Sequence, residues 1–348
     1  MGSKNIRHTF RRYRTLQTDY ISELPIVILM PHSACNCRCV MCDIWKNNNH
    51  PHQLNEKDIA NLLSALQEFN VQEVLMSGGE ALMNPQFFAF CRMLKKHGIK
   101  ITLLSTGLLL QKFAVNLLEQ VDQIIVSLDG DQDTHDRIRR IPGAFQQMAS
   151  GIQRIRQMNP IYRISGRTVI HRLNFRQWPQ IVSAAADLGL DQISFLPADV
   201  SSHAFNRELL LDGARQAELL VAESELAELA QIIGLLIENN RSHFLSGFIA
   251  ESPAKLKKIH LYYAAFYGLN DFPYKKCNAP WVSTVIEADG KVRPCFFHPP
   301  IGDIHQKDLA SILNSPHALG FRKSLDVATN PTCVKCVCSI NLRPGANP

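Results

Sequence analysis

Ten cysteines in this chain fall mainly into two groups that lie far apart, and cysteines grouped in this way are typical of metal or redox chemistry. No apolar run near the N-terminus is long enough for a signal-peptide core or a membrane span, so a reducing cytosol is the expected compartment. In that compartment clustered thiols indicate metal ligation rather than disulfides. The first group is Cys35, Cys37, Cys39 and Cys42, and the second is Cys277, Cys295, Cys333, Cys336 and Cys338.

Within the first group, Cys35, Cys39 and Cys42 have the spacing C-x3-C-x2-C and follow the expected strand Ile26–Met30. Three thiolates on one loop suit three corners of a cubane iron–sulfur cluster, whose fourth iron then stays open to another ligand. A structural zinc site is the alternative. It needs four ligands, and Cys37 would be the fourth.

The three-cysteine spacing resembles the signature of the radical S-adenosylmethionine (radical SAM) enzymes, and a second motif supports this. Gly78-Gly79-Glu80 directly follows the second expected strand and is similar to the turn that in the family contacts the amino group of SAM. Glycines let the backbone approach a ligand, and a carboxylate suits an ammonium group. The resemblance covers about residues 25–200. It departs at Met41, where the family often has an aromatic residue near the adenine; a thioether can fill that role.

The resemblance also implies cofactor contacts at the ends of other strands. Ser127 and Asp129 resemble the stretch that binds the ribose, although turn chemistry is the plainer interpretation of this pair. Arg163, Arg172 and Asn174 flank the fifth strand, where the family often places a carboxylate or ribose contact. The implied cofactor-binding set is Met41, Gly78, Gly79, Glu80, Ser105, Ser127, Asp129, Arg163, Arg172, Asn174 and Leu196.

The second cysteine group follows the pattern C-x12-G-x4-C around an expected hairpin, Val282–Ile286 and Lys291–Pro294. With the distal cysteine pair, this is similar to the auxiliary-cluster domain called SPASM or, in its shorter single-cluster form, Twitch. The resemblance implies one auxiliary [4Fe-4S] cluster. A zinc ribbon is the alternative for the same thiolates. The implied ligands are Cys277, Cys295, Cys333 and Cys336, with Cys338 an alternative to one of the last pair.

The elements that must position these residues alternate regularly. Short apolar runs typical of buried parallel strands lie at Ile26–Met30, Glu73–Ser77, Ile99–Ser105, Gln123–Leu128, Ile164–Ile170 and Gln192–Leu196. Helical spacing lies between them at Asn55–Phe69, Pro85–His97, Gln111–Glu119, Phe145–Gln157 and Phe175–Leu188. The pattern predicts an α/β fold with right-handed βαβ units. Six strands are too few for a closed eight-stranded barrel, so we expect a partial (β/α)6 barrel with a small C-terminal hairpin-plus-helix domain. Its active site would lie at the carboxyl ends of the strands.

Four regions are expected: a basic N-terminal arm at 1–24, the radical SAM core at 25–200, a helical connection at 201–276 and a Twitch-like domain at 277–348. The arm holds Arg7, His8, Arg11, Arg12 and Arg14, and its plainer interpretation is a solvated charge run. Across the 348 residues 46% are hydrophobic and 20% charged, which excludes a disordered chain. Cys91 is expected to be a buried, inert thiol.

The resemblance implies an oxidoreductase or related enzyme that cleaves SAM reductively to a 5′-deoxyadenosyl radical, which removes a hydrogen atom from the substrate. It also implies an electron donor such as flavodoxin or ferredoxin. The expected substrate is a small polar biosynthetic molecule (a sugar, an aminocyclitol or a nucleotide-derived compound), with net oxidation through the auxiliary cluster as one outcome. A ribosomal peptide is the second choice, because the roughly 24 residues before the first strand leave no room for a winged-helix peptide-recognition domain. A metal-dependent nucleic-acid-binding protein is the non-enzymatic alternative, and the net charge of +6 is mild for it.

Overall fold

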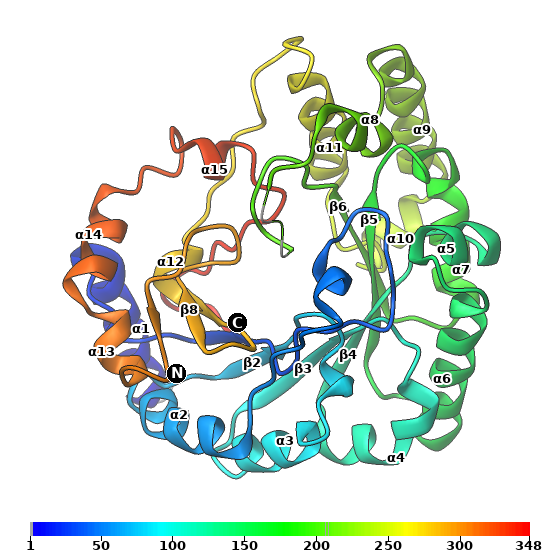
Figure 1. Cartoon of the computed structure of the whole chain (residues 1–348). Helices are drawn as coiled ribbons and strands as arrows, with labels where there is room; N and C mark the ends of the chain where they lie inside the picture. The colour runs from blue at the N-terminus through cyan, green and yellow to red at the C-terminus, as the bar shows by residue number, and fades with distance from the viewer. Residues whose placement is uncertain (1–2, 206, 208) are drawn as a thin grey trace.

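The centre of the molecule is a nine-stranded sheet in the order β6-β5-β4-β3-β2-β1-β7-β8-β9 (Figure 1). The computed structural model describes residues 3–205, 207 and 209–348. The first six strands pair in parallel, and in the described part of the chain no pairing joins β6 to β9. The predicted partial barrel is therefore confirmed. These strands are β1 Ile26–Leu29, β2 Glu73–Met76, β3 Lys100–Ser105, β4 Gln123–Ser127, β5 Ile164–Ile170 and β6 Gln192–Pro197.

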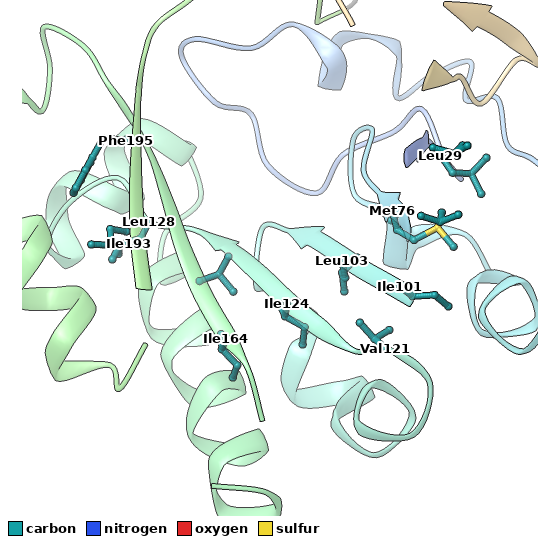
Figure 2. Close-up of a cluster of buried hydrophobic side chains, with 14 of the residues drawn as sticks. Leu29, Met76, Ile101, Leu103, Val121, Ile124, Leu128, Ile164, Ile193 and Phe195 are labelled. Atoms are coloured by element: carbon teal, nitrogen blue, oxygen red, sulfur yellow. The ribbon is translucent and has the colours of Figure 1, made fainter. Parts of the chain in front are cut away.

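Helices cover the outer face of the six parallel strands (Figure 1). They are α2 Glu56–Glu68, α3 Phe87–Lys95, α4 Leu110–Gln120, α6 Ala144–Met158 and α7 Trp178–Asp187, with the shorter α5 Gln132–Arg139 near the carboxyl edge. The main core lies between these helices and the sheet, and Figure 2 shows its side chains along adjacent strands, among them Ile101, Leu103, Ile124, Ile164 and Ile193. Each of these five side chains is fully buried. Because side chains alternate between the two faces of a strand, their positions fix which face of each strand packs against the helices.

Two contacts identify the two faces of β5 and β6. The ring of Phe195 on β6 lies 5.2 Å from that of Trp178 on α7, so this side of β6 faces the helices. A Cβ atom on Gly166 of β5 would meet the side chain of Ile193 at 2.5 Å, which places Gly166 on the same side. Because neighbours along a strand point to opposite faces, Arg167 faces the interior of the barrel.

The C-terminal hairpin was predicted, but its attachment to the barrel was not. Strand β7 (Ser283–Ile286) pairs in parallel with β1, with Ile26 opposite Ser283 and Leu29 opposite Ile286. Strands β8 (Lys291–Arg293) and β9 (Gly302–Asp303) continue antiparallel. The remaining C-terminal elements are α12 Ala279–Val282, α13 Leu309–Leu313, α14 Pro316–Ser324 and α15 Pro331–Val334. The second cysteine group is thus built onto the sheet that carries the first.

The helical connection covers the free edge of β6. The backbone N–H of Ile193 donates to the carbonyl of Phe248 at 2.7 Å, and Ala250 donates to the carbonyl of Ile193 at 2.9 Å. These bonds satisfy an edge that would otherwise be open to pairing with another chain. The helices of this region are α8 Gly213–Leu219, α9 Leu226–Asn239, α10 Arg241–Leu245 and α11 Pro253–Ala265.

The N-terminal region differs from the expected solvated arm, because α1 (Ser3–Thr18) is a helix packed on the domain. Arg12 is only 2% exposed, forms an ion pair with Glu23 at 3.1 Å and donates to the carbonyl of Arg343 at 3.1 Å. The charge run alone could not show that one arginine would be buried against residues more than 300 positions away. Within the described residues, no helix combines the length and the apolar character needed to cross a membrane.

Helix α3 starts two residues later than the sequence predicts. Pro85 was expected as its first residue, but the helix begins at Phe87. The side-chain oxygen of Asn84 accepts a hydrogen bond from the backbone of Gln86 at 2.8 Å, which forms a turn before the helix. The Asn84 amide in turn donates to the carbonyls of Pro31 and Leu54 at 2.7 and 2.9 Å. Asn84 therefore fixes the loop that follows β1.

Candidate functional site

The first cysteine loop lies directly against the Gly78–Glu80 turn at the carboxyl edge of the sheet. The backbone N–H of Glu80 donates to the carbonyl of Ala34 at 2.9 Å. A Cβ atom on Gly79 would stand 2.1 Å from that same carbonyl oxygen. Gly78 has a φ of +106°, a conformation open to glycine and strained for other residues. The turn and the loop can approach this closely because both positions, 78 and 79, are glycine.

The thiols of this loop differ in their electrostatic surroundings. The pKa of Cys39 is lowered to about 6, first by the hydrogen bond from Cys37 and then by Arg139, whose Nη1 lies 3.3 Å from the Cys39 sulfur, while burial opposes them. Burial raises the pKa of Cys42 to about 12 and also raises the pKa of Cys35. Cys39 is therefore the thiol most ready to bind metal as a thiolate. Cys37 is buried and acts as a hydrogen-bond donor to its neighbour.

The Glu80 carboxylate is fully buried and holds the end of β2 to the end of β3. It accepts hydrogen bonds from the backbone N–H and hydroxyl of Thr106 at 2.8 and 2.7 Å, from the hydroxyl of Ser105 and from the backbone of Leu82 at 3.3 Å. Burial raises its pKa, and these hydrogen bonds lower it. A carboxylate has about four acceptor positions. Direct contact with an ammonium group would therefore require one of these donors to move aside.

Asp129, at the end of β4, forms a buried ion pair that the sequence did not predict. Its Oδ2 lies 2.5 Å from Nη2 of Arg139 on α5, and the same guanidinium reaches the sulfur of Cys39. Burial raises the pKa of Asp129, and the charge of Arg139 lowers it. The arginine thus connects a carboxylate of the sheet to a thiol of the cysteine loop.

Replacement of Asp129 by Asn is expected to destabilise the protein by about 3–5 kcal/mol, because it leaves a buried guanidinium without its counter-charge. Chemical denaturation measures the change. The matched control is Glu228→Gln, which removes a carboxylate paired with Arg176 where both side chains are more than 40% exposed. The control should cost at most about 1 kcal/mol. Equal losses in the two variants would contradict the buried-pair interpretation.

The other sequence-predicted cofactor residues divide into two sets. Ser127 and Leu196 lie on the inward-facing sides of β4 and β6, and Asn174 is buried, donating to the carbonyls of Asp129 and Val169 at 3.0 Å each. Arg163 precedes β5 and is exposed at the opposite edge of the sheet from the cysteine loop. Arg172 points outward and pairs with Glu225 at 2.9 Å. The structure does not bring these two arginines to the site.

Two further arginines hold the cysteine loop from outside, and sequence reasoning missed both. Arg207 pairs with Asp199 at 2.5 Å and donates to the carbonyl of Met41 at 3.1 Å. Arg215 forms a bidentate pair with Asp43, at 2.8 and 2.9 Å. Met41 and Asp43 each lie more than 160 residues in the chain from the arginine that contacts them, so no local sequence pattern predicts these contacts.

All five C-terminal cysteines line one cavity, together with Lys275 and His298. The Nε2 atom of buried His298 lies 3.3 Å from the sulfur of Cys333. The ammonium of Lys275 donates to the carbonyl of Cys336, and the backbone of Cys338 donates to the Cys336 sulfur at 3.4 Å. The cavity therefore gathers thiols and hydrogen-bond donors that point to sulfur. Which four of the five thiols would serve as ligands stays a prediction.

Both cysteine groups fit an iron–sulfur cluster by the chemistry of their donors, since such clusters are held mainly by thiolates. In the described part of the chain, no three His, Cys, Asp or Glu side chains meet the spacing of a single metal ion.

Comparison with known proteins gives matches to two domain families. Residues 29–185 match the radical SAM superfamily, and residues 277–337 match the SPASM iron–sulfur cluster-binding domain. An Fe-coproporphyrin III synthase of Methanosarcina barkeri is 26% identical over 205 residues, which cover 57% of this chain and 51% of that protein. A probable GTP 3′,8-cyclase of Saccharolobus islandicus is 23% identical over 269 residues, 76% of this chain and 80% of that protein.

The chain spans about half the length of the first curated relatives it matches. Among solved structures, Streptococcus suis SuiB superposes with a TM-score of 0.65 at 15% identity, over 97% of this chain and 76% of that one. At this identity the likeness concerns the fold alone.

Proposed function

Because the chain belongs to the radical SAM superfamily and carries a C-terminal SPASM domain, we propose that it is an enzyme that cleaves SAM reductively and removes a hydrogen atom from a small biosynthetic substrate. The observation that carries this proposal is the contact between the Cys35–Cys42 loop and the Gly78–Glu80 turn. Their backbones meet where a single added Cβ would collide with the carbonyl of Ala34 at 2.1 Å. That contact sets three thiols beside a glycine-rich surface fit for a bound nucleotide.

When bound, a reduced four-iron cluster supplies the electron that splits SAM into methionine and a 5′-deoxyadenosyl radical. We assign Cys35, Cys39 and Cys42 as the residues that would hold this cluster. Arg139 orients Cys39 and favours its ionised form. Glu80 keeps the turn in place by binding the end of β3, and the inward faces of β4, β5 and β6 surround the space where a substrate would lie.

The second site would hold one auxiliary cluster on four of its five cysteines, as in the single-cluster form of the domain. Lys275 and His298 would lie beside it. Ten cysteines without a disulfide suit a reducing compartment, and we propose a cytosolic electron donor such as a flavodoxin or ferredoxin.

A small-molecule substrate is favoured by one relative whose match covers most of both chains. The match to the GTP 3′,8-cyclase covers 76% of this chain and 80% of that protein, whose name describes an activity on a nucleotide. A peptide substrate is the second candidate. It is supported by the sporulation killing factor maturation protein SkfB of Bacillus subtilis, which is 26% identical over 141 residues, or 40% of this chain.

The direct test is anaerobic reconstitution of the chain with iron and sulfide, followed by reduction with dithionite in the presence of SAM. We expect about eight irons per chain, four for each cluster, and the formation of 5′-deoxyadenosine. A parallel sample treated with zinc instead of iron is the control. The zinc sample should form no 5′-deoxyadenosine, because zinc has no redox chemistry. An iron-reconstituted chain that forms no 5′-deoxyadenosine would contradict the proposal, and about four irons would remove the auxiliary cluster from it.

The contact between His298 and Cys333 gives a prediction for the second site. His298→Phe keeps an aromatic ring against Phe321, whose centroid lies 4.9 Å away, but removes the donor to sulfur. Hydrogen bonds to cluster sulfurs stabilise the reduced state, so the variant should lower the midpoint potential of the auxiliary cluster while keeping its iron. EPR-monitored redox titration measures the shift. An unchanged potential with full iron content would show that His298 serves packing only.

A further inference from the structure

Arg167 is the one charged side chain on the inward faces of β4, β5 and β6 in the described part of the chain. The other residues on these faces are apolar or polar without charge. The strand register places Arg167 directly between Ser127 of β4 and Ser194 of β6. The three side chains therefore form one row across the interior wall of the barrel.

The guanidinium of Arg167 is not paired with a carboxylate among the described residues, unlike those of Arg139 and Arg207 beside the cysteine loop. Arg139 pairs with Asp129, and Arg207 pairs with Asp199. Arg167 donates from Nε to the hydroxyl of Ser194 at 3.3 Å. A guanidinium carries five N–H donors in a rigid fork that matches a carboxylate or phosphate, so most of its capacity is left for a ligand.

We propose that Arg167 binds an anionic group of the substrate, a carboxylate or a phosphate, inside the barrel. This inference rests on the proposed function and names the chemical class of its substrate. The carboxylate of SAM is the competing ligand for this arginine, because the resemblance implies a carboxylate or ribose contact beside the fifth strand. The SAM affinity of Arg167→Gln distinguishes the two.

The test measures anion binding to the reconstituted full chain with SAM present, by calorimetric titration with inorganic pyrophosphate and, separately, with glutarate. Arg167→Gln should weaken binding of the better probe at least tenfold. Arg167→Lys should keep part of it, since lysine supplies the charge without the fork. The matched control is Arg154→Gln, an exposed arginine on α6, which should bind the probe as the parent does. The probe that binds the parent protein more tightly shows whether the site prefers a phosphate or a carboxylate group.

Three outcomes would overturn the inference: neither probe binds the parent, Arg167→Gln binds as tightly as Arg154→Gln, or Arg167→Gln loses tenfold or more in SAM affinity, which would assign Arg167 to the cofactor. If Arg167→Gln does not fold by circular dichroism, the comparison of Arg167→Lys with the parent decides. The proposed function fails separately, if the parent forms no 5′-deoxyadenosine, because the probe titrations do not depend on SAM cleavage.

Discussion

Simultaneous replacement of Cys35, Cys39 and Cys42 by alanine is expected to abolish 5′-deoxyadenosine formation and to halve the iron content, from about eight to about four per chain. These thiols share one loop at the carboxyl edge of the barrel, and they are the ligands assigned to the cluster that activates SAM. The second cysteine group lies in a cavity of its own and should keep its cluster. Iron analysis, absorption spectra and product quantification measure the result.

The control for this experiment is Cys91→Ala, which makes the same chemical change in the core of α3, away from either group. It should retain both clusters and the cleavage of SAM. Cleavage that persists in the triple variant would refute the ligand assignment, and loss of all iron would show that the two sites do not assemble independently.

Replacement of Gly79 by alanine adds only one methyl group, but it is also expected to impair SAM binding strongly. The new Cβ would lie 2.1 Å from the carbonyl oxygen of Ala34 and 2.6 Å from its carbon, both backbone atoms of the cysteine loop. Either the loop or the turn must move. We expect at least a tenfold loss of SAM affinity and a destabilisation of about 1–3 kcal/mol, as for other overpacked sites. Equilibrium binding and chemical denaturation measure the two effects.

Gly234→Ala is the matched control, since Gly234 lies within α9 and a Cβ there would meet no atom within 4 Å. This substitution should stabilise the helix by about 1 kcal/mol and leave SAM binding as it is. A Gly79→Ala variant that binds SAM like the parent would show that the close approach of loop and turn is not needed for the cofactor.

Much of the barrel could be predicted, because its signals are local. The six parallel strands are short apolar runs bounded by turns, which is the sequence pattern typical of buried parallel strands. The pairing of β7 with β1 could not be predicted, since more than 250 residues separate Ile26 from Ser283. The sequence of each strand is equally compatible with pairing to other strands. For the same reason the charge run of α1 gave no sign that Arg12 meets the C-terminal tail.

The candidate site divides along the same line. Cysteine spacing and the Gly78-Gly79-Glu80 turn are contiguous motifs, and the structure places them together. Arg139 had a weaker signal: it follows Ile138 on the buried face of an amphipathic helix, where an arginine needs a partner. No sequence signal marked Arg167, because the sequence does not show which face of its strand lines the interior of the barrel.

The parallel pairing of β7 with β1 has a mechanical consequence. The strand that leads into the first cysteine loop is hydrogen-bonded along its length to the strand that opens the second cysteine region. Relative movement of the two redox centres would require breaking the hydrogen bonds between β1 and β7 inside a continuous sheet, since no flexible linker alone joins the two regions. We therefore expect the distance between the two cysteine sites to change little when a substrate binds.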